Sequence, residues 1–398
     1  MTVIDLPELD RTIVDRAIEI RRDLHAHPEI AYEEHRTAGV IAAELERLGI
    51  AHRTGLAGGT GVLAWIEGRD SDDVVALRTD IDALPIEEET GLPWASTIPG
   101  RMHACGHDGH TAIMLGTAAR LADLAERGQL PRSVAMVFQP AEEGGAGGRR
   151  MVEDGVLDGS IAPWPVARIY GLHGWPLDPA GTTGTILGPM LAASDKFEIE
   201  VSGEGCHAAW PHSGRDPIAA AAAIVTALHA IVSRNVDPLD AAVVRVTKIS
   251  AGSTFNVIPP NASLAGTARS LSNEVRDLLE RRIAEVAEGV ATAHGCTATA
   301  TYHRGYPVTV NHPDPTARFE RLAREELGDE AYRPMPGPVM GGEDFSFYGE
   351  KVPACFYVLG QQAEGGEPMP ALHSPRYDFN DETISTGIRL MSRVAVDG

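Results

Sequence analysis

The sequence is poor in cysteine, with only four among its 398 residues: Cys105, Cys206, Cys296 and Cys355. No two of them are closely spaced, which argues against a disulfide scaffold. We therefore expect a protein of a reducing, cytoplasmic compartment. A long apolar run is also missing, because the most apolar stretch, residues 218–232, is interrupted by His229 and is too short to span a bilayer.

Two further features are missing. The first residues, Met1–Glu8, contain no basic region followed by an apolar run, so we expect no signal peptide. Positive charge is scarce: 34 Lys and Arg residues face 56 Asp and Glu residues, which gives a formal net charge of −22. Nucleic acids and anionic membrane surfaces would repel such a chain, so we expect neither as a partner.

The length exceeds the roughly 250–300 residues at which a single core stops growing. Hydrophobic residues make up 43% of the chain, enough for two cores. The helical patterns lie at 9–24, 36–48 and 111–124, and the strand-like apolar runs at 61–66, 74–77, 133–138, 168–172 and 354–359. Their alternation predicts an α/β fold with a mainly parallel sheet covered by helices on both faces. We assign it to a catalytic, metal-binding domain of residues 1–189 and 305–398.

The pattern changes in residues 190–304. There the chain reads strand, helix, strand, strand, helix, strand, and residues 196–201 alternate as a half-exposed strand does. This order is typical of a compact α+β unit with an antiparallel sheet. We expect an inserted lid domain.

The densest chemistry lies in Arg101–His110, whose ten residues include three histidines, one cysteine and one aspartate. These are metal-ligand residue types. Cys105 and His107 are two residues apart, so one short loop can offer both to one or two ions. For an isolated pair of this kind, a buried and inert cysteine is the ordinary alternative.

Polar residues follow three of the strand-like runs: first Asp80, then Glu142 and Glu143, then His173. In open α/β sheets, ligands bind outside the carboxyl ends of the strands, so one cleft can collect these side chains with the Cys105 loop. Adjacent glutamates are usually solvent-exposed, but Glu142 and Glu143 follow an apolar strand. One can bind a metal ion while the other moves a proton.

Other candidates lie further along the chain. His373 precedes Ser374-Pro375 and would complete a ligand set. In the lid, His207 follows a glycine-rich turn and would stabilise an oxyanion. Asn256 and Arg269 would bind a substrate carboxylate.

Together the motifs resemble the amidohydrolase branch of the aminoacylase/glutamate-carboxypeptidase family of two-metal metallopeptidases, which includes hippurate hydrolases and indole-acetate–amino-acid conjugate hydrolases. The matching segments run through almost the whole chain. They are Asp23–Glu29, Leu77–Pro85, His103–His110, Phe138–Gly144, Gly171–Gly174, His207–His212, Phe255–Pro259, Gly342–Phe345 and Leu372–Pro375.

The resemblance implies roles for the candidate residues. The implied metal ligands are Cys105, His107, Glu143, His173 and His373. Glu142 would be the general base, His207 the lid histidine near the scissile carbonyl, and Asp80 a residue that orients a ligand from behind. Two divalent metal ions would then support hydrolysis of the amide bond of a small N-acyl amino acid. The lid of such enzymes commonly mediates dimerisation, which implies a homodimer or a higher homo-oligomer.

The metal and one detail of the lid stay open. Thiolate and imidazole ligands favour zinc, relatives are often active with manganese, and cobalt or nickel would also fit. The family usually has glycine where Cys206 stands, directly before His207, so a side chain here would alter the turn that aims the histidine.

Three other functions compete with this one. A dipeptidase or carboxypeptidase of the same family would differ only in its pocket. A metal-stabilised binding protein would have no use for Glu142. A cysteine hydrolase would need Cys105 as its nucleophile, and a thiolate that bridges metals is a poor one. The sequence also leaves open the acyl group, the amino acid, and whether His207 acts in its own or a neighbouring subunit.

Overall fold

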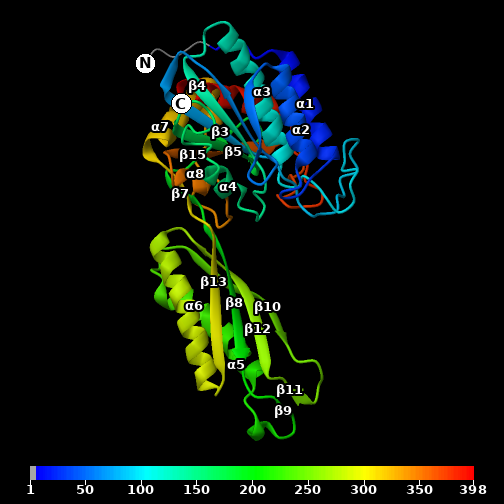
Figure 1. The fold of residues 1–398 in the computed structure, drawn as a ribbon, viewed down its shortest axis with the longest axis vertical. Helices are drawn as coiled ribbons and strands as arrows, with labels where there is room; N and C mark the ends of the chain where they lie inside the picture. The colour runs from blue at the N-terminus through cyan, green and yellow to red at the C-terminus, as the bar shows by residue number, and fades with distance from the viewer. Residues whose placement is uncertain (1–5) are drawn as a thin grey trace. The chain divides into compact units, whose positions relative to one another are not determined.

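The structure is a computed structural model that describes residues 6–398. The residues on which the absence of a signal peptide was judged lie mostly outside this range. The described chain divides into two compact units (Figure 1). Unit 1 comprises the described residues up to Gly188, Val310–Gly337 and Asp344–Gly398, and unit 2 comprises Pro189–Thr309 and Pro338–Glu343. The expected lid, 190–304, falls within unit 2, whereas no sequence pattern indicated the return segment 338–343.

Unit 1 is built on a seven-stranded sheet with the order β1-β2-β4-β3-β5-β15-β6. Its central strands are β4 (Arg132–Gln139), β3 (Asp70–Asp80), β5 (Val166–Pro179) and β15 (Ala354–Gln362). The flanking strands are β1 (Ala51–Leu56), β2 (Gly61–Ile66) and β6 (Thr183–Gly184), of which β1 and β6 form the two edges. The central four are mutually parallel and the edges pair antiparallel. The carboxyl ends of the central strands therefore share one edge, as the α/β prediction requires.

Successive residues of the central strands point to opposite faces of this sheet. On β3, Leu77 joins the large apolar core, and Arg78 therefore points to the other face. The helices that supply this core are α1 (Arg11–Ala26), α2 (His35–Arg47), α3 (His107–Glu126), α7 (Pro313–Leu327) and α9 (Ile384–Asp397). On the other face, Phe345 packs against Phe356 of β15 with ring centroids 5.0 Å apart. The short helices α4 (Gly147–Glu153) and α8 (Ser346–Gly349) contact β4 and β15 respectively.

Two of the elements that are longer than the sequence patterns indicated extend over a candidate metal ligand. Helix α3 begins at His107 rather than Thr111. It follows Gly106, which has φ 92° and where a Cβ would lie 2.8 Å from the Tyr377 hydroxyl. Strand β5 continues through His173 rather than ending before it, because β15 still pairs with β5 beyond the point where β3 stops.

Unit 2 is an antiparallel sheet with two helices. The strand order is β10 (Ala242–Ala251), β12 (Asn261–Ser270), β8 (Ala193–Ser202) and β13 (Thr297–Tyr306), and the helices are α5 (Pro217–Asn235) and α6 (Asn273–Ala293). The short strands β9 (Cys206–His207) and β11 (Val257–Ile258) form a separate pair. The remaining short elements are β7 (Gly188–Leu191), β14 (Thr309–Asn311) and the 3-10 turns Pro211–Ser213, Asp329–Ala331 and Asp381–Thr383.

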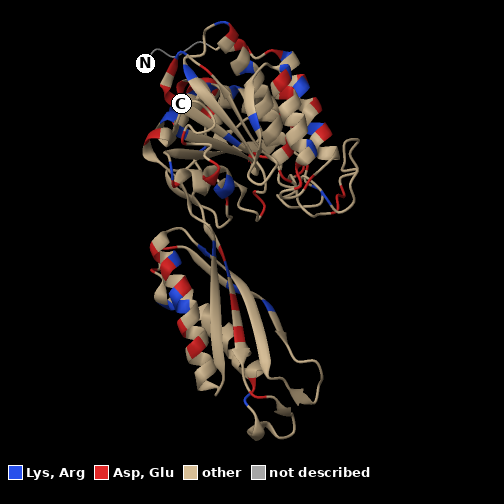
Figure 2. Cartoon of the chain, in the orientation of Figure 1, with Lys and Arg blue, Asp and Glu red and all other residues tan. Residues whose placement is uncertain are grey.

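Helix α5 is the one helix of residues 6–398 with the length and composition to cross a membrane, at 19 residues and mean hydropathy 1.5. Its Ala220, Ile224 and Leu228 are buried in the core of unit 2, a placement that core helices share. The outer surface of α6 interleaves acidic and basic side chains, as Figure 2 shows, with Arg281 lying 3.8 Å from Glu285. These charges form a mixed surface rather than a field of one sign.

A buried ionic cluster ties α1 to the start of α3. Arg21 and His25 of α1 are fully buried, and both contact the Asp108 carboxylate, at 2.9 Å from Arg21 Nε and 2.8 Å from His25 Nδ1. The other ring nitrogen of His25 lies 3.3 Å from Glu88. Burial alone would lower the pKa of His25, but the two carboxylates outweigh it and raise the pKa to about 9. A cationic His25 therefore joins Glu88 and α3 to α1.

We predict that the stability contributed by His25 depends on pH. Its pKa in the folded protein lies above the ordinary value of about 6.5. The contribution is therefore complete below that pH and is lost as the pH rises towards 9. The difference in thermal midpoint between metal-free wild type and His25→Gln should be largest near pH 6 and shrink by pH 9. Two midpoints that change in parallel over this range would contradict the prediction.

Candidate metal centre

The structure brings the five expected ligand residues together in unit 1. Ligand atoms of Cys105, His107 and His173 all lie within 4.8 Å of one another, and so do those of Cys105, Glu143 and His373. Cys105 belongs to both groups. Its Sγ lies 3.4 Å from His173 Nε2, and on the other side His373 Nε2 lies 3.1 Å from Glu143 Oε1. One thiolate is thus placed to serve two neighbouring ions.

These ligands come from four separate segments of the chain. Cys105 and His107 flank Gly106 at the start of α3, Glu143 lies in the turn after β4, and His173 lies on β5. His373 lies in the loop after β15 with φ 65°, a left-handed conformation that is uncommon for a residue with a side chain. Its amide donates a hydrogen bond to the Ala104 carbonyl at 2.8 Å, which fixes this loop beside the Cys105 loop.

The hydrogen bonds of two histidines leave one ring nitrogen of each for a metal ion. His107 Nδ1 lies 2.9 Å from the Asp82 carbonyl oxygen, so it donates there, and its Nε2 is buried without a hydrogen-bond partner. His173 Nδ1 donates to the Gly174 carbonyl at 2.7 Å, which leaves Nε2 facing Cys105. Burial lowers the pKa of His173 to about 3, so its ring is neutral. An imidazole that donates through one nitrogen offers the other as a ligand.

The turn after β4 places two carboxylates at the centre. Glu143 donates its amide to Asp82 at 2.9 Å. Burial alone would raise the pKa of the Glu143 carboxyl, but the hydrogen bond from His373 and nearby positive charge lower it, so Glu143 is ionised. The buried Glu142 has a carboxylate oxygen within 4.8 Å of the His107 and Glu143 ligand atoms. Two carboxylates with separate contacts can divide metal binding and proton transfer.

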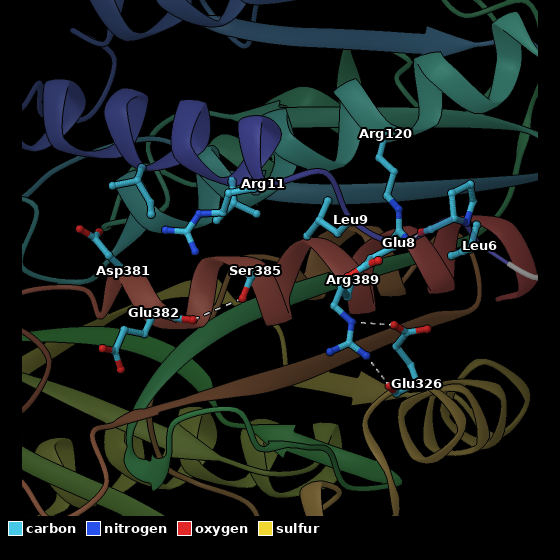
Figure 3. Close-up of a pocket in the computed structure, with 13 residues that line it drawn as sticks. Leu6, Glu8, Leu9, Arg11, Arg120, Glu326, Asp381, Glu382, Ser385 and Arg389 are labelled. Atoms are coloured by element: carbon cyan, nitrogen blue, oxygen red, sulfur yellow. Dashed lines mark hydrogen bonds and ion pairs between the residues drawn. The ribbon is translucent and has the colours of Figure 1, made fainter.

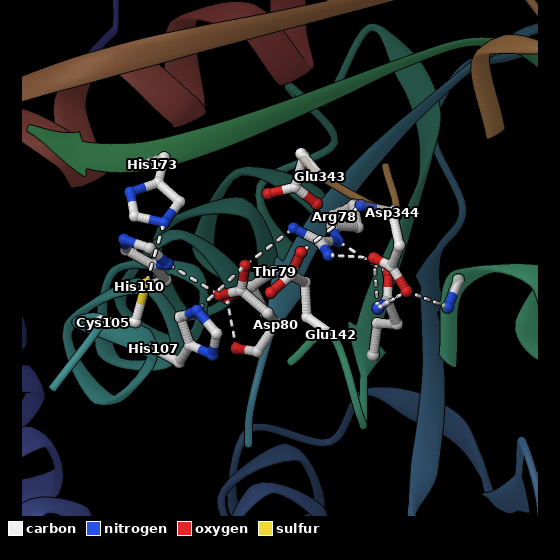
Figure 4. A network of polar contacts seen from close by, with 12 residues as sticks. Arg78, Thr79, Asp80, Cys105, His107, His110, Glu142, His173, Glu343 and Asp344 are labelled. Carbon is white, nitrogen blue, oxygen red and sulfur yellow. Dashed lines mark hydrogen bonds and ion pairs between the residues drawn. The ribbon is translucent and has the colours of Figure 1, made fainter. Parts of the chain in front are cut away.

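The buried Arg78 contacts the carboxylates of Asp80 and Asp344 beside the candidate ligands, as Figure 4 shows. Arg78 donates to Asp80, Asp344 and Gln139, each at 2.8 Å, and is fully buried. The second oxygen of Asp80 accepts from His110 Nδ1 at 2.7 Å. Burial would raise the pKa of the Asp80 carboxyl, yet its positively charged neighbours hold the pKa well below its usual range. His107, Arg78 and His110 thus keep Asp80 ionised, and Arg78 also pairs with the buried Asp344.

The expectation that Asp80 orients a ligand from behind stays a prediction, and the structure adds Asp82 as a second carboxylate next to His107. Asp82 accepts the hydrogen bond from His107, whereas Asp80 accepts from His110. His110 Nε2 in turn accepts the Gly174 amide at 2.8 Å, so both nitrogens of His110 are occupied and it is not a ligand. Asp80 also lies near a candidate ligand, with its Oδ2 3.7 Å from His107 Nε2.

The sequence patterns did not single out four residues that shape the centre: Arg78, Asp82, His110 and Asp344. Two of them had a readable signal. Arg78 is a charge directly after the apolar run 74–77, which a buried strand tolerates only with partners. Asp82 lies two residues after Asp80 at the same strand end. His110 and Asp344 had no signal beyond their presence in polar motifs.

In unit 2, two of the three candidates lie close together. His207 is exposed on β9, its Nδ1 accepts from the Ala209 amide at 3.1 Å, and its ring lies against Trp210 with centroids 4.9 Å apart. The carbonyl oxygen of Asn256 accepts from the Ala208 amide at 3.0 Å. His207 and Asn256 therefore occupy the same end of unit 2.

Arg269 lies at the other end. Its side chain donates a hydrogen bond to the Thr267 hydroxyl at 2.7 Å. Arg269 is near the end of β12, eight residues after Asn261, the first residue of that strand. A strand of eight residues spans about 26 Å. Because β11 ends three residues before Asn261, one copy of unit 2 does not bring Arg269 together with His207 and Asn256.

The structure also accommodates Cys206. Its side chain lies beside Gly214, where an added Cβ would come within 2.7 Å of the sulfur. The backbone pairing of Cys206 with Ile258 and of His207 with Val257 is intact. The absence of a side chain at Gly214 thus leaves room for the Cys206 sulfur.

A large groove in unit 1 is unrelated to these ligands. It has a volume of about 970 Å³ and lies between the segment Leu6–Leu9, α1 and α9, as Figure 3 shows. Its Arg389 and Glu326 pair at 2.9 Å, whereas its Arg11 and Asp381 pair with residues outside the lining. None of its lining residues belongs to the candidate set. The candidate metal site is therefore defined by its ligand residues and does not coincide with this groove.

Comparisons with known proteins identify the family of the chain. The family model for peptidase family M20/M25/M40 matches residues 76–397. An N-acetylcysteine deacetylase of Bacillus subtilis is 40% identical over 390 residues, covering 97% of this chain and 98% of the relative. An IAA-amino acid hydrolase of Arabidopsis thaliana is 40% identical over 385 residues, covering 96% of this chain and 85% of the relative.

A solved structure is also similar. The Bacillus subtilis YXEP protein, described as a dinuclear metal-binding peptidase from the M20 family, superposes with a TM-score of 0.82 at 36% identity, covering 97% of this chain and 98% of that one. The family match spans most of the chain, and the similarity to the curated relatives is full-length. The chain therefore belongs to peptidase family M20/M25/M40.

Proposed function

We propose that this protein is a metal-dependent amidohydrolase that cleaves the amide bond of N-acyl amino acids into a carboxylate and a free amino acid. The main support is the convergence of five ligand residues from distant segments, with a further carboxylate beside them. The relatives named N-acetylcysteine deacetylase and IAA-amino acid hydrolase support this bond type. The acyl group and the amino acid stay open.

Two divalent ions would be held by Cys105, His107 and His173 on one side and by Cys105, Glu143 and His373 on the other. The orphaned Nε2 of His107 and the neutral ring of His173 fit this role. When bound, the ions would lower the pKa of a water molecule and polarise the amide carbonyl. Zinc is favoured by the thiolate and imidazole ligands, and manganese, cobalt or nickel would also fit.

Glu142 would move the proton in this reaction. It precedes the ligand Glu143 by one residue and is only 6% exposed, so it would exchange protons with the attacking water rather than with bulk solvent. It would then deliver the proton to the leaving amine.

We predict that Glu142→Gln binds metal as wild type does but loses turnover. The amide keeps the size of the side chain and cannot accept the proton, so kcat should fall by at least about 10²-fold. Metal content by elemental analysis and kcat on an N-acyl amino acid check this. Glu33→Gln, an exposed neighbour of the α2 start, is the control. A Glu142→Gln variant of wild-type turnover would remove the proposed base.

The reaction class is tested with metal-stripped protein. We predict that adding back one of zinc, manganese, cobalt or nickel restores hydrolysis of one class among N-acetyl, N-benzoyl and indole-acetyl amino acids. Cleavage of dipeptides but of no acyl amino acid would instead favour a dipeptidase or carboxypeptidase. The similarity to a protein described as an M20 peptidase supports that second candidate.

In the lid, His207 would stabilise the negative charge that develops on the carbonyl oxygen, and Asn256 and Arg269 would bind the substrate carboxylate. Because Arg269 lies at the opposite end of unit 2, one copy cannot present all three to a small substrate. We therefore propose a homodimer in which a second copy supplies His207 and Asn256. The side chain of Phe255 beside them is 97% exposed, which supports contact with another chain.

Complementation tests this arrangement. Glu142→Gln and His207→Ala should each be inactive alone. If His207 acts across subunits, each mixed dimer regains one intact site of its two, and an equilibrated mixture should recover about a quarter of wild-type activity. A mixture that stays inactive, although exchange of differently tagged subunits is verified, would assign His207 to its own subunit.

The competing cysteine mechanism has little support. Without a metal ion, burial raises the pKa of the Cys105 thiol, which disfavours a free nucleophilic thiolate; a bound metal ion would deprotonate the thiol and hold its sulfur as a ligand. All four cysteines are free thiols. This supports the cytoplasmic location that we propose.

A further inference from the structure

The turn that presents Glu142 and Glu143 has an unusual backbone. Ala141 and Ala146, on either side of the glutamates, have φ 54° and 55°, and Gly144 has φ 84°. Left-handed residues with a side chain persist only where their surroundings hold them. A Cβ at Gly147 would lie 1.7 Å from the Pro140 carbonyl oxygen, so the turn is also tightly closed. Something outside the turn must therefore fix its shape.

A buried glutamate from a distant segment makes one of these contacts. Glu34 directly precedes α2 and is fully buried. Its Oε1 accepts a hydrogen bond from the Ala141 amide at 2.9 Å, and its Oε2 accepts from the Thr60 hydroxyl at 2.8 Å. The Ala141 side of the turn, one residue before Glu142, is thus held by a residue 107 positions earlier.

Tyr32 makes the second contact. Its hydroxyl donates to the Gly145 carbonyl at 2.5 Å, and the Arg150 guanidinium lies over its ring at 4.1 Å. A Cβ at Gly145 would lie 3.0 Å from the Tyr32 ring and 2.6 Å from the Ala141 side chain, so the approach leaves no room for one. Tyr32 itself has φ 64°. Glu34 therefore holds the backbone one residue before Glu142, and Tyr32 holds it two residues after Glu143.

We propose that Glu34, assisted by Tyr32, is a positioning residue that holds the Ala141–Gly145 turn so that Glu142 and Glu143 keep their places. The inference rests on the proposed function for the roles of these two glutamates. Glu34 would act on them through the backbone amide of Ala141.

The chemistry of Glu34 indicates the substitutions to compare. Glutamine can still accept from the Ala141 amide through its carbonyl oxygen and can donate to the Thr60 hydroxyl, so Glu34→Gln retains the contact. Glu34→Ala leaves the buried Ala141 amide without an acceptor. Glu33→Ala is the matched control, because Glu33 is half-exposed and pairs with Arg101 at 2.8 Å.

Two measurements test the proposal. The first is hydrogen–deuterium exchange of the segment 139–147 in metal-free protein, which requires no activity. The second is kcat and KM at saturating metal, with metal content measured on the same samples. We expect faster exchange in this segment and a kcat lower by about 10- to 100-fold in Glu34→Ala, since small misplacements of catalytic groups have such costs. KM and metal content should change less than threefold, and Glu34→Gln and Glu33→Ala should resemble wild type.

Unchanged exchange in Glu34→Ala, or a kcat within twofold of wild type, would overturn the proposal. So would a loss of kcat that excess metal fully restores, because the defect would then be one of metal affinity alone. If Glu34→Ala does not fold, Tyr32→Phe removes the second contact and should show the same exchange pattern with a smaller loss of kcat. If wild type itself hydrolyses no N-acyl amino acid, the proposed function fails, while the exchange data still decide whether Glu34 holds the turn.

Discussion

The metal centre depends on buried hydrogen-bond acceptors that lie behind its histidines. The Asp82 and Gly174 carbonyls each accept a hydrogen bond from the Nδ1 of one imidazole. Nε2 of His173 therefore faces the Cys105 sulfur, and Nε2 of His107 is buried without a hydrogen-bond partner. Without these acceptors the rings could rotate or exchange tautomers, and a metal would have to reorganise them. The hydrogen-bond acceptors behind the histidines are thus part of the site along with the ligands.

Keeping so many carboxylates ionised in a dry interior requires buried positive charge. Arg78 serves Asp80 and Asp344, and Arg21 with His25 serves Asp108. A buried carboxylate that lost its partner would become protonated or draw in water, because an unpaired charge is costly in low dielectric. These cations come from β3 and α1, elements fixed by the main core, so the packing of unit 1 sets the electrostatics of the centre.

Left-handed backbone recurs where the centre is assembled. His373, Ala141 and Ala146 all have positive φ, although each has a side chain. Each of the first two is fixed by a hydrogen bond of its own amide, to the Ala104 carbonyl and to Glu34 respectively. The rest of the structure therefore stabilises local conformations that these segments would not adopt alone.

The amino-acid sequence by itself determined the fold class, the alternation of helices and strands, and the identity of the ligand candidates. It did so because periodicity and residue chemistry are local properties, visible in runs such as 133–138 and in the segment His103–His110. Only the tertiary structure decided that Asp82 rather than Asp80 accepts from His107, that both nitrogens of His110 are occupied, and that Arg269 lies apart from His207. It also decided that Glu34 reaches Ala141. These contacts join residues from about 25 to more than 100 positions apart, and hydrogen-bond geometry in a packed interior leaves no trace in local sequence patterns.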